Sequence, residues 1–480
     1  MTTRASLAAV LAAAMLATAC DGGPNDPKPE PVKPGIGIVA GAGTTDTVQA
    51  TPVQALNVLV TGPDGKPAAG APVLFESGFA TLGGSRAATM TVGPVVSSAF
   101  TTSVGDTTDA SGVASVRVRF GTIAGAGKVV VTVPTLGFQD TARYNVTPGA
   151  PTQTLIAPRD TAMYMAGTVT LHTGIFDRLG NRRPEAPTLS GPAALTISGN
   201  TVSTSTFGRH LVRASYPGTI SDSTTVTALP RGRLAAASGY MGTSVVMMDL
   251  DGSNRVTAAV GGTIYGLDWA PDGRVVAGVG NSSTSTLQAV SASGEVKPFL
   301  TGSTAGSEAY PVFSADGKKV FFAGRNPGAF SFSNTLWHAN ADGTGVQATT
   351  LSLSFDWGTS YGPSPDGSRV VFQSSVYNVQ TQARTTLSPT RISSWSWSPL
   401  GDLVAFNDYE TMGVMKPDGT ERRVFSSAYT GFSDRTIDWS GDGKYIVVRS
   451  SFGALDLLEV ATGTRVMIPR ASNLALAVLK

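Results

Sequence analysis

The chain has 480 residues, which exceeds a single ordinary hydrophobic core and corresponds to about three domains. Hydrophobic residues make up 41% of it and charged residues only 14%, a mix that excludes a wholly disordered chain. The net charge of +2, without a basic cluster, excludes a dedicated nucleic-acid surface. With 56 glycines and 29 prolines, the composition favours short strands and tight turns, so we predict an all-β fold.

Residues 1–20 predict a secretory signal peptide. Arg4 supplies a positive charge, an apolar stretch follows, and small residues precede Cys20. Cys20 is the only cysteine, so no disulfide can form within the chain. No other segment approaches the roughly 18 apolar residues of a membrane-spanning helix, and we expect the rest of the chain to be exported.

The stretch LATAC, residues 16–20, resembles the lipobox of bacterial lipoproteins, in which the cysteine is lipidated and becomes the mature N-terminus. It departs from that pattern because Leu16 stands four residues before the cysteine and Ala17 stands three before it. The resemblance implies lipidation of Cys20. The alternative is an ordinary signal peptide that is cut nearby and leaves Cys20 as a thiol.

Residues 21–35, DGGPNDPKPEPVKPG, predict a linker, because five prolines and few apolar side chains cannot build a core. Such a sequence favours polyproline II, which rises about 3.1 Å per residue and gives about 45 Å over this segment. We expect the linker to hold the folded part away from a membrane surface.

Residues 36–148 predict a first β-sandwich. In DASGVASVRVRFGT, residues 109–122, apolar residues alternate with Arg117 and Arg119, the two-residue period of a half-buried strand. Val-rich segments predict further strands at 55–60 and 128–133. The stretches DGKPAAGAPVLF and TTDASGVASVRVRFGT resemble the invasin and intimin type of bacterial Ig-like domain. This resemblance implies a spacer or adhesion module without catalysis.

Residues 149–229 predict a second Ig-like β-sandwich. The segment GTVTLHTGIFDRLGNRR, residues 167–183, alternates like a strand and is interrupted by an Asp-Arg-Leu-Gly turn. Later strands are predicted in GRHLVRASY and STTVTAL. Pro230, within ALPRGRL at 228–234, marks the boundary to the next domain.

A repeated motif fills residues 230–480. Five copies carry a glycine turn followed by an apolar run: LDWAPDGRVVAGV (267–279), PVFSADGKKVFFA (311–323), YGPSPDGSRVVFQ (361–373), WSWSPLGDLVAFN (395–407) and IDWSGDGKYIVVR (437–449). The Asp-Gly pair favours a tight turn, because Asp caps its own backbone and Gly accepts a positive φ. Each copy therefore predicts a strand, a turn and a second strand.

A second hairpin alternates with the first, at 245–257, 287–299, 336–348, 413–425 and 455–468, with a degenerate copy lacking the glycine at 376–387. Two hairpins in about 42 residues predict a four-stranded propeller blade. Before the first of these hairpins, GRLAAASG at 232–239 resembles a second strand, whereas NLALAVL at 473–479 has no partner of its own. We therefore expect the C-terminal strand to pair with the first blade and close a ring of six blades, which removes exposed sheet edges.

The five copies resemble the TolB-type propeller repeat, whose pattern is WSPDGKxIAF. Departures are Pro363 at the aromatic position, Leu400 at the Asp position, and the missing turn glycine near Gln382. The predicted architecture is all-β, with two Ig-like sandwiches followed by a TolB-like six-bladed propeller. The resemblance to TolB implies protein interaction in the cell envelope but no particular partner.

No motif predicts an enzyme. GTSYG, residues 358–362, matches the G-x-S-x-G pattern with Ser360 as nucleophile, but that pattern needs a strand-to-helix turn and a later histidine, and none follows His338. His172 and His210 are also isolated, unlike the ligands of a zinc site. DLDGSN, residues 249–254, lacks the twelfth-position Glu of a calcium loop. We expect no catalytic residue, no metal and no cofactor, and we interpret GTSYG as a chance match.

The residues just before each aromatic position are the candidates for lining the propeller's central funnel: Asp268, Glu308, Tyr310, Tyr361, Trp395 and Asp438. Aromatic and acidic groups around one axis can bind a peptide, a sugar or a cation. The alternative for each of them is packing between blades.

These observations predict a non-catalytic, lipid-anchored, monomeric protein of the bacterial cell envelope. Its partners would be a membrane, through the lipid, and an envelope protein or glycan bound by the propeller. One alternative is an envelope hydrolase or lyase with an acidic site in the funnel, which clustered acidic residues of raised pKa would favour. Another is surface adhesion through the Ig-like modules.

Overall fold

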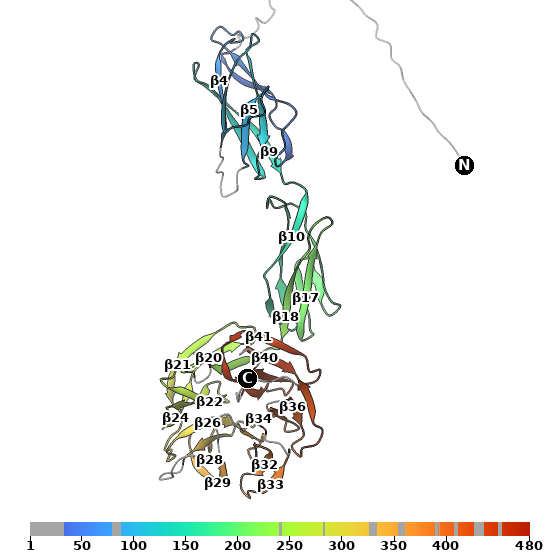
Figure 1. The fold of residues 1–480 in the computed structure, drawn as a ribbon. Coiled ribbons are helices and arrows are strands. Elements are labelled where there is room, and N and C mark those ends of the chain that lie inside the picture. Colours follow the sequence, from blue (N-terminus) through green and yellow to red (C-terminus); the bar gives the residue numbers. More distant parts are fainter. Residues whose placement is uncertain are drawn as a thin grey trace, which may run out of the picture. The chain divides into compact units, whose positions relative to one another are not determined.

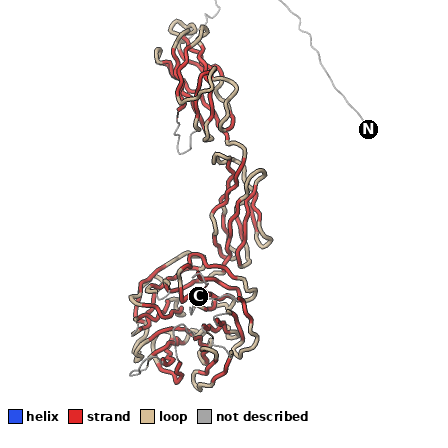
Figure 2. The backbone as a smooth tube through the Cα atoms, viewed as in Figure 1, coloured by secondary structure: helices blue, strands red, loops and turns tan. Residues whose placement is uncertain are grey.

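The structure is a computed structural model that describes residues 33–78, 88–239, 242–281, 284–325, 334–353, 361–388, 392, 394–407, 411–426, 436–449 and 454–480. Every regular element in these ranges is a β-strand, as Figure 2 shows, so the predicted all-β class is confirmed. Within the same ranges no helix offers the length and hydrophobicity of a membrane span. The chain divides into two compact units, Met1–Pro151 with Phe176–Arg183, and Thr152–Ile175 with Pro184–Lys480.

The first unit contains two facing sheets. One has the strand order β1 (Gly35–Ala40), β3 (Leu56–Thr61), β7 (Val113–Phe120) and β5 (Met90–Pro94). The other has the order β2 (Thr45–Thr47), β9 (Phe138–Thr147), β8 (Gly125–Val133), β4 (Pro72–Gly78) and β6 (Ser103–Thr107). Inward residues of both sheets, Val116, Val118 and Phe120 among them, form one apolar core. The predicted alternation in β7 is therefore observed, with the two arginines pointing outward.

Short strands follow the first sandwich. β10 (Pro151–Ala157) pairs with β13 (His172–Asp177). A four-stranded sheet has the order β11 (Thr161–Tyr164), β18 (Asp222–Leu229), β17 (Gly208–Ser215) and β14 (Thr188–Ser190). A three-stranded sheet has the order β12 (Thr168–Thr170), β16 (Thr201–Ser203) and β15 (Thr196–Ser198). An apolar cluster that includes Leu171, Val202 and Val226 lies between them.

The described residues from Arg233 onward form six four-stranded antiparallel sheets, visible in Figure 1 as a ring of strands. From the innermost strand outward, the first sheet contains β42 (Ala475–Leu479), β19 (Arg233–Ala237), β20 (Ser244–Asp249) and β21 (Val256–Ala259). The second contains β22 (Thr263–Trp269), β23 (Val275–Gly280), β24 (Ser285–Val290) and β25 (Val296–Pro298). The third contains β26 (Glu308–Phe313), β27 (Lys319–Gly324), β28 (Asn334–Asn340) and β29 (Gln347–Leu353). The fourth sheet contains β30 (Tyr361–Pro363), β31 (Arg369–Phe372), β32 (Ser375–Asn378) and β33 (Arg384–Thr386). The fifth contains β34 (Ser394–Trp397), β35 (Val404–Asn407), β36 (Met412–Met415) and β37 (Arg423–Ser426). The sixth contains β38 (Ile437–Trp439), β39 (Tyr445–Arg449), β40 (Ala454–Glu459) and β41 (Arg465–Ser472).

Each consecutive pair of these sheets encloses its own apolar cluster. One cluster lies between each sheet and the next, and the sixth cluster lies between the sixth sheet and the first. The innermost strands also contact one another in the order β22, β26, β30, β34, β38, β42 and back to β22. Sheets that radiate from a common axis in this way form a β-propeller.

The C-terminal strand belongs to the first sheet, although more than 200 residues separate it from its neighbour. β42 pairs antiparallel with β19 through Leu234↔Leu479 and Ala235↔Val478. The side chains of Leu474 and Leu479 are buried in the cluster between the sixth and first sheets. Burying apolar side chains that otherwise lie at an unpaired sheet edge stabilises the ring.

The turns explain the glycine column of the repeat. The turn glycine of every copy has a positive φ, between 67° and 89°, which residues other than glycine adopt only at a cost in free energy. These glycines are Gly273, Gly317, Gly367, Gly401 and Gly443. In the degenerate hairpin at 376–387, which lacks the glycine, Gln382 adopts the positive φ, at 59°. The turn is kept in the copy where Leu400 replaces the Asp, because Asp402 accepts a hydrogen bond from the Ser398 hydroxyl.

Candidate functional site

A cavity of about 380 Å³ lies among the innermost propeller strands, with residues of β22, β26, β30, β34, β38 and β42 in its wall. This volume lies within the range of small-ligand sites, about 300–1,000 Å³. Because the six innermost strands converge on one axis, a residue at the same repeat position of each sheet contributes to the same wall. The cavity is therefore a direct product of the repeat.

Five of the six predicted funnel residues line this cavity: Asp268, Tyr310, Tyr361, Trp395 and Asp438. Glu308 is not among the residues that line this cavity. Its side chain is buried within the sheet region, where Oε2 accepts the N–H of Leu287 at 3.1 Å. The physical reason is an irregularity of β26 between Ala309 and Val312, where Tyr310 has a φ of 57° and the strand alternation shifts.

The two carboxylates of the cavity each connect neighbouring strands. Oδ2 of Asp268 on β22 accepts the N–H of Phe313 on β26 at 2.7 Å. In the same way, Oδ2 of Asp438 on β38 accepts the N–H of Leu479 on β42 at 2.9 Å. Asp438 Oδ1 also accepts the hydroxyl of Ser396 at 3.2 Å. Both carboxylates therefore have a structural role as well as a position in the cavity wall.

The environment of this pair disfavours ionisation. Burial raises the pKa of Asp438 to about 6. Burial, and then the negative charge of Asp438, raise the pKa of Asp268 well above its ordinary value, although the N–H groups of Phe313 and Trp269 oppose the rise. Two interacting carboxyl groups release their protons in separate steps. The two carboxyl groups of the cavity therefore retain their protons to a higher pH than exposed carboxyl groups do.

Aromatic residues give the wall its rigidity. The hydroxyl of Tyr361 donates to the carbonyl oxygen of Tyr310 at 2.7 Å, which connects β30 to β26. Trp439 Nε1 donates to the carbonyl of Ser396 at 3.1 Å, and Trp395 Nε1 donates to the carbonyl of Gln373. These side chains pack between sheets and also face the cavity. A preformed aromatic wall suits a ligand with an apolar or ring-shaped face.

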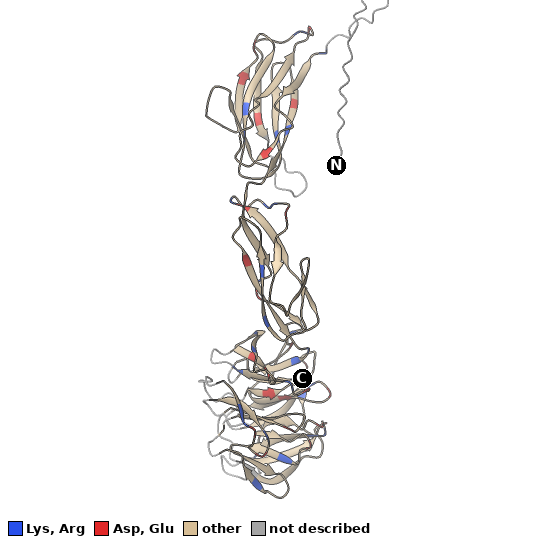
Figure 3. Ribbon diagram, turned by 90° about the vertical axis from the view of Figure 1, so that its right-hand side faces the viewer, with Lys and Arg blue, Asp and Glu red and all other residues tan. Residues whose placement is uncertain are grey.

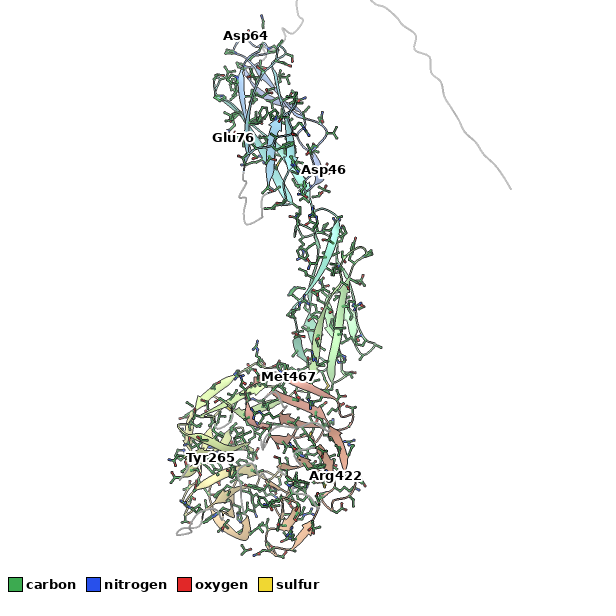
Figure 4. All side chains as sticks on the ribbon, in the orientation of Figure 1. Asp46, Asp64, Glu76, Tyr265, Arg422 and Met467 are labelled. Carbon is green, nitrogen blue, oxygen red and sulfur yellow. The ribbon has the colours of Figure 1, made fainter. Side chains whose placement is uncertain are left out.

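Sequence reasoning missed several parts of the site. Ser396 occupies the repeat position of Asp268 and Asp438, so the alignment of the five copies could have found it. Tyr265, labelled in Figure 4, packs edge-on against Tyr310 at a ring distance of 6.4 Å. Lys480 lies at the rim, with Nζ 5.5 Å from the ring centre of Trp269. No sequence signal points to Tyr265 or Lys480, because neither follows the repeat.

Other candidate chemistry gains no support. Among the described residues no cluster of three or more His, Cys, Asp or Glu side chains could hold a metal. His210 Nε2 lies 3.0 Å from the carbonyl of Thr206, and burial lowers the pKa of His338. Asp251 Oδ1 accepts both the N–H and the hydroxyl of Ser253, as in an ordinary turn. Ser360 and Cys20 lie outside the described residues.

No protein-family model and no curated protein matches the chain. Among solved structures, it is similar to TolB from Acinetobacter baumannii, with 13% identity and a TM-score of 0.43 over 61% of this chain and 82% of that one. A nidogen/laminin complex has 13% identity and a TM-score of 0.39, over 52% and 98%. A putative TolB from Agrobacterium tumefaciens has 15% identity and a TM-score of 0.37, over 50% and 88%. At these values the likenesses carry no argument about function, and the propeller assignment depends on the strand pairing above.

Proposed function

We propose that the chain is an exported, lipid-anchored protein of the bacterial cell envelope that binds a protein or glycan segment in the propeller cavity. In this proposal the propeller has six blades, is closed by the C-terminal strand, and is carried by Ig-like modules. The cavity itself carries the proposal. It combines a rigid aromatic wall with carboxyl groups that can donate and accept hydrogen bonds, which is the chemistry that recognises peptide groups and sugar hydroxyls.

Site-specific photo-crosslinking in cells tests the binding proposal. A photoreactive side chain replaces Tyr310, which lines the cavity, or Tyr377, a partly buried tyrosine on β32 outside it. We expect a discrete adduct from position 310 and none from position 377. Mass analysis of the adduct then distinguishes a protein from a glycan. Equal labelling at the two positions, or none at position 310, would contradict a ligand in the cavity.

The membrane anchor is tested separately. We expect the wild-type chain to incorporate radiolabelled palmitate and to sediment with membranes, and the Cys20→Ser variant to do neither. Unchanged labelling of the variant would contradict lipidation at Cys20. This outcome is independent of the crosslinking result, because residue 20 is no part of the propeller.

Catalysis of hydrolysis is a second candidate function, favoured by the two carboxyl groups of raised pKa in one cavity. A protonated and an ionised carboxyl group can act as general acid and general base on a glycosidic or similar bond. The carboxylates' hydrogen bonds to backbone N–H groups favour the structural role. Incubation of the mature chain with peptidoglycan fragments decides between them. Turnover that is lost in both Asp268→Asn and Asp438→Asn would support hydrolysis, and the absence of turnover would leave binding.

A further inference from the structure

The strands of one sheet of the first sandwich contribute only positively charged side chains. The strands β1, β3, β7 and β5 contain no Asp or Glu, and their charged residues are Arg117 and Arg119 on β7. Both arginines alternate with the buried residues of β7, so they lie on the face away from the core. Asp106 of β6 reaches this sheet from its side, and its Oδ2 accepts the N–H of Ser115 at 2.8 Å. Figure 3 shows the charged residues by colour.

The segment after β5 folds over this face. A Cβ atom at Gly93 would lie 2.1 Å from the carbonyl oxygen of Ala99, so only glycine lets the segment approach so closely. The ring of Phe100 contacts both arginines, whose Cζ atoms are 5.3 Å and 5.8 Å from its centre. These contacts hold both guanidinium groups beside an aromatic ring at the surface.

The same segment exposes apolar side chains. Val95 is 47% exposed and Val96 is 98% exposed, directly after the end of β5. Two neighbouring exposed valines beside two cations form a surface whose apolar part water solvates poorly. We define this surface, made of Val95, Val96, Phe100, Arg117 and Arg119, as the cationic rim.

The strand register places the cationic rim near the point where the N-terminal segment enters the fold. Pro94 pairs with Val116, so β5 runs toward the Val113 end of β7 and Val95 follows in that direction. Leu59 pairs with Val113, and Gly35 pairs with Thr61, two residues further along β3. The first residue of β1 therefore lies at the same end of the sheet as the valines.

We propose that the cationic rim docks on an anionic lipid surface, with Val95 and Val96 in the headgroup region and the two arginines beside the lipid phosphates. Arginine pairs with phosphate through two parallel N–H donors. Transfer of the Val95 and Val96 side chains from water into the headgroup region lowers the free energy. The expected linker, residues 21–35, would span about 45 Å as polyproline II, so the rim of a chain anchored at Cys20 lies within reach of the membrane that holds the anchor. The docking itself does not require the lipid.

Vesicle sedimentation of the unlipidated mature chain, residues 21–480, tests this inference separately from lipidation. Vesicles of phosphatidylglycerol and phosphatidylethanolamine provide the anionic surface, and phosphatidylcholine vesicles provide the neutral one. We expect binding to the anionic vesicles, weakened by salt. Arg117→Gln with Arg119→Gln should lower the partition coefficient about 25-fold, because each basic residue near an anionic surface contributes a factor of about five. Val95→Ser with Val96→Ser should lower it about tenfold.

A matched control variant also removes two positive charges, but from the other sheet of the first sandwich. Lys128 and Arg143 are cross-strand neighbours on β8 and β9, and their outward side chains are exposed to a similar degree as the two arginines. Lys128→Gln with Arg143→Gln should change binding by less than about threefold. Equal losses in the control and the arginine variant would overturn the assignment. Binding to a soluble anionic polysaccharide but not to vesicles would also overturn it, in favour of a glycan.

Discussion

The backbone N–H of Leu479 donates a hydrogen bond of 2.9 Å to Oδ2 of Asp438, across the junction between the sixth and first propeller sheets. Because Leu479 also pairs with Leu234 in β19, one residue of the C-terminal strand is held by both neighbours. A lone carboxylate thus contributes to ring closure. This relationship makes the acidic pair a structural element of the ring as well as part of the cavity.

Replacing Asp438 with alanine should destabilise the propeller. The buried N–H of Leu479 then loses its acceptor, at a cost of about 1–3 kcal/mol in the free energy of unfolding. Asp438→Asn should cost less, because an amide oxygen can still accept that N–H and no charge is buried. Urea unfolding followed by tryptophan fluorescence measures both. Equal stabilities of wild type and Asp438→Ala would show that this hydrogen bond does not contribute to closure.

The acidic pair should make stability fall as pH rises. Burial raises the pKa of Asp438 to about 6, and that of Asp268 is raised well above its ordinary value. The folded state therefore retains protons that the unfolded chain, with carboxyl pKa values near about 4, has released. By proton linkage the unfolding free energy decreases from about pH 4 through pH 6 and beyond.

The double variant Asp268→Asn with Asp438→Asn should remove this decrease. Its stability should therefore change between pH 4 and pH 7 by at least about 2 kcal/mol less than that of the wild type, which is the contribution of Asp438 alone. Asp366 does not interfere, because hydrogen bonds from Ser364 and Ser368 lower its pKa to about 2 and its contribution falls below this pH range. Urea midpoints in matched buffers provide the comparison. A double variant with the wild-type pH profile would contradict the raised pKa values.

The repeat made most of the propeller predictable. Turn chemistry defines each hairpin, since glycine at positive φ and an Asp cap are local requirements, and the structure has the expected strand on either side of each one. The pairing of the 473–479 segment with the 232–239 segment followed from counting unpaired strands. It needed no knowledge of three-dimensional contacts.

The cavity was only partly predictable, because local backbone geometry decides which side chains face it. Glu308 and Tyr310 are two residues apart and would share a face in a regular strand, yet the irregularity of β26 separates them. The sequence predicted that Asp268 and Asp438 line one funnel, but it did not predict the burial and the interaction that raise the pKa of Asp268. These residues are 170 positions apart, and only ring closure brings them around one axis.

The C-terminal strand should be essential for propeller stability. Leu479 is 7% exposed in the cluster between the sixth and first sheets, so Leu479→Ala should lower the unfolding free energy by about 2–4 kcal/mol through lost burial and a cavity. Met467 on β41, labelled in Figure 4, is 58% exposed, and Met467→Ala should change it by less than about 0.5 kcal/mol. Thermal unfolding of both variants tests this contrast. Similar midpoints would mean that β42 contributes little to the ring.

The hydrogen bond between Tyr361 and Tyr310 should position the aromatic wall. The Tyr361 hydroxyl donates to the Tyr310 carbonyl at 2.7 Å, and Tyr310 has a left-handed φ of 57°, which costs conformational energy. Tyr361→Phe removes this donor, so it should cost about 1 kcal/mol in unfolding free energy and reduce crosslinking from position 310. Tyr377→Phe on β32 is the control and should leave the crosslinking yield unchanged. If Tyr361→Phe retains wild-type crosslinking while losing stability, the hydroxyl serves blade packing alone and does not position the cavity wall.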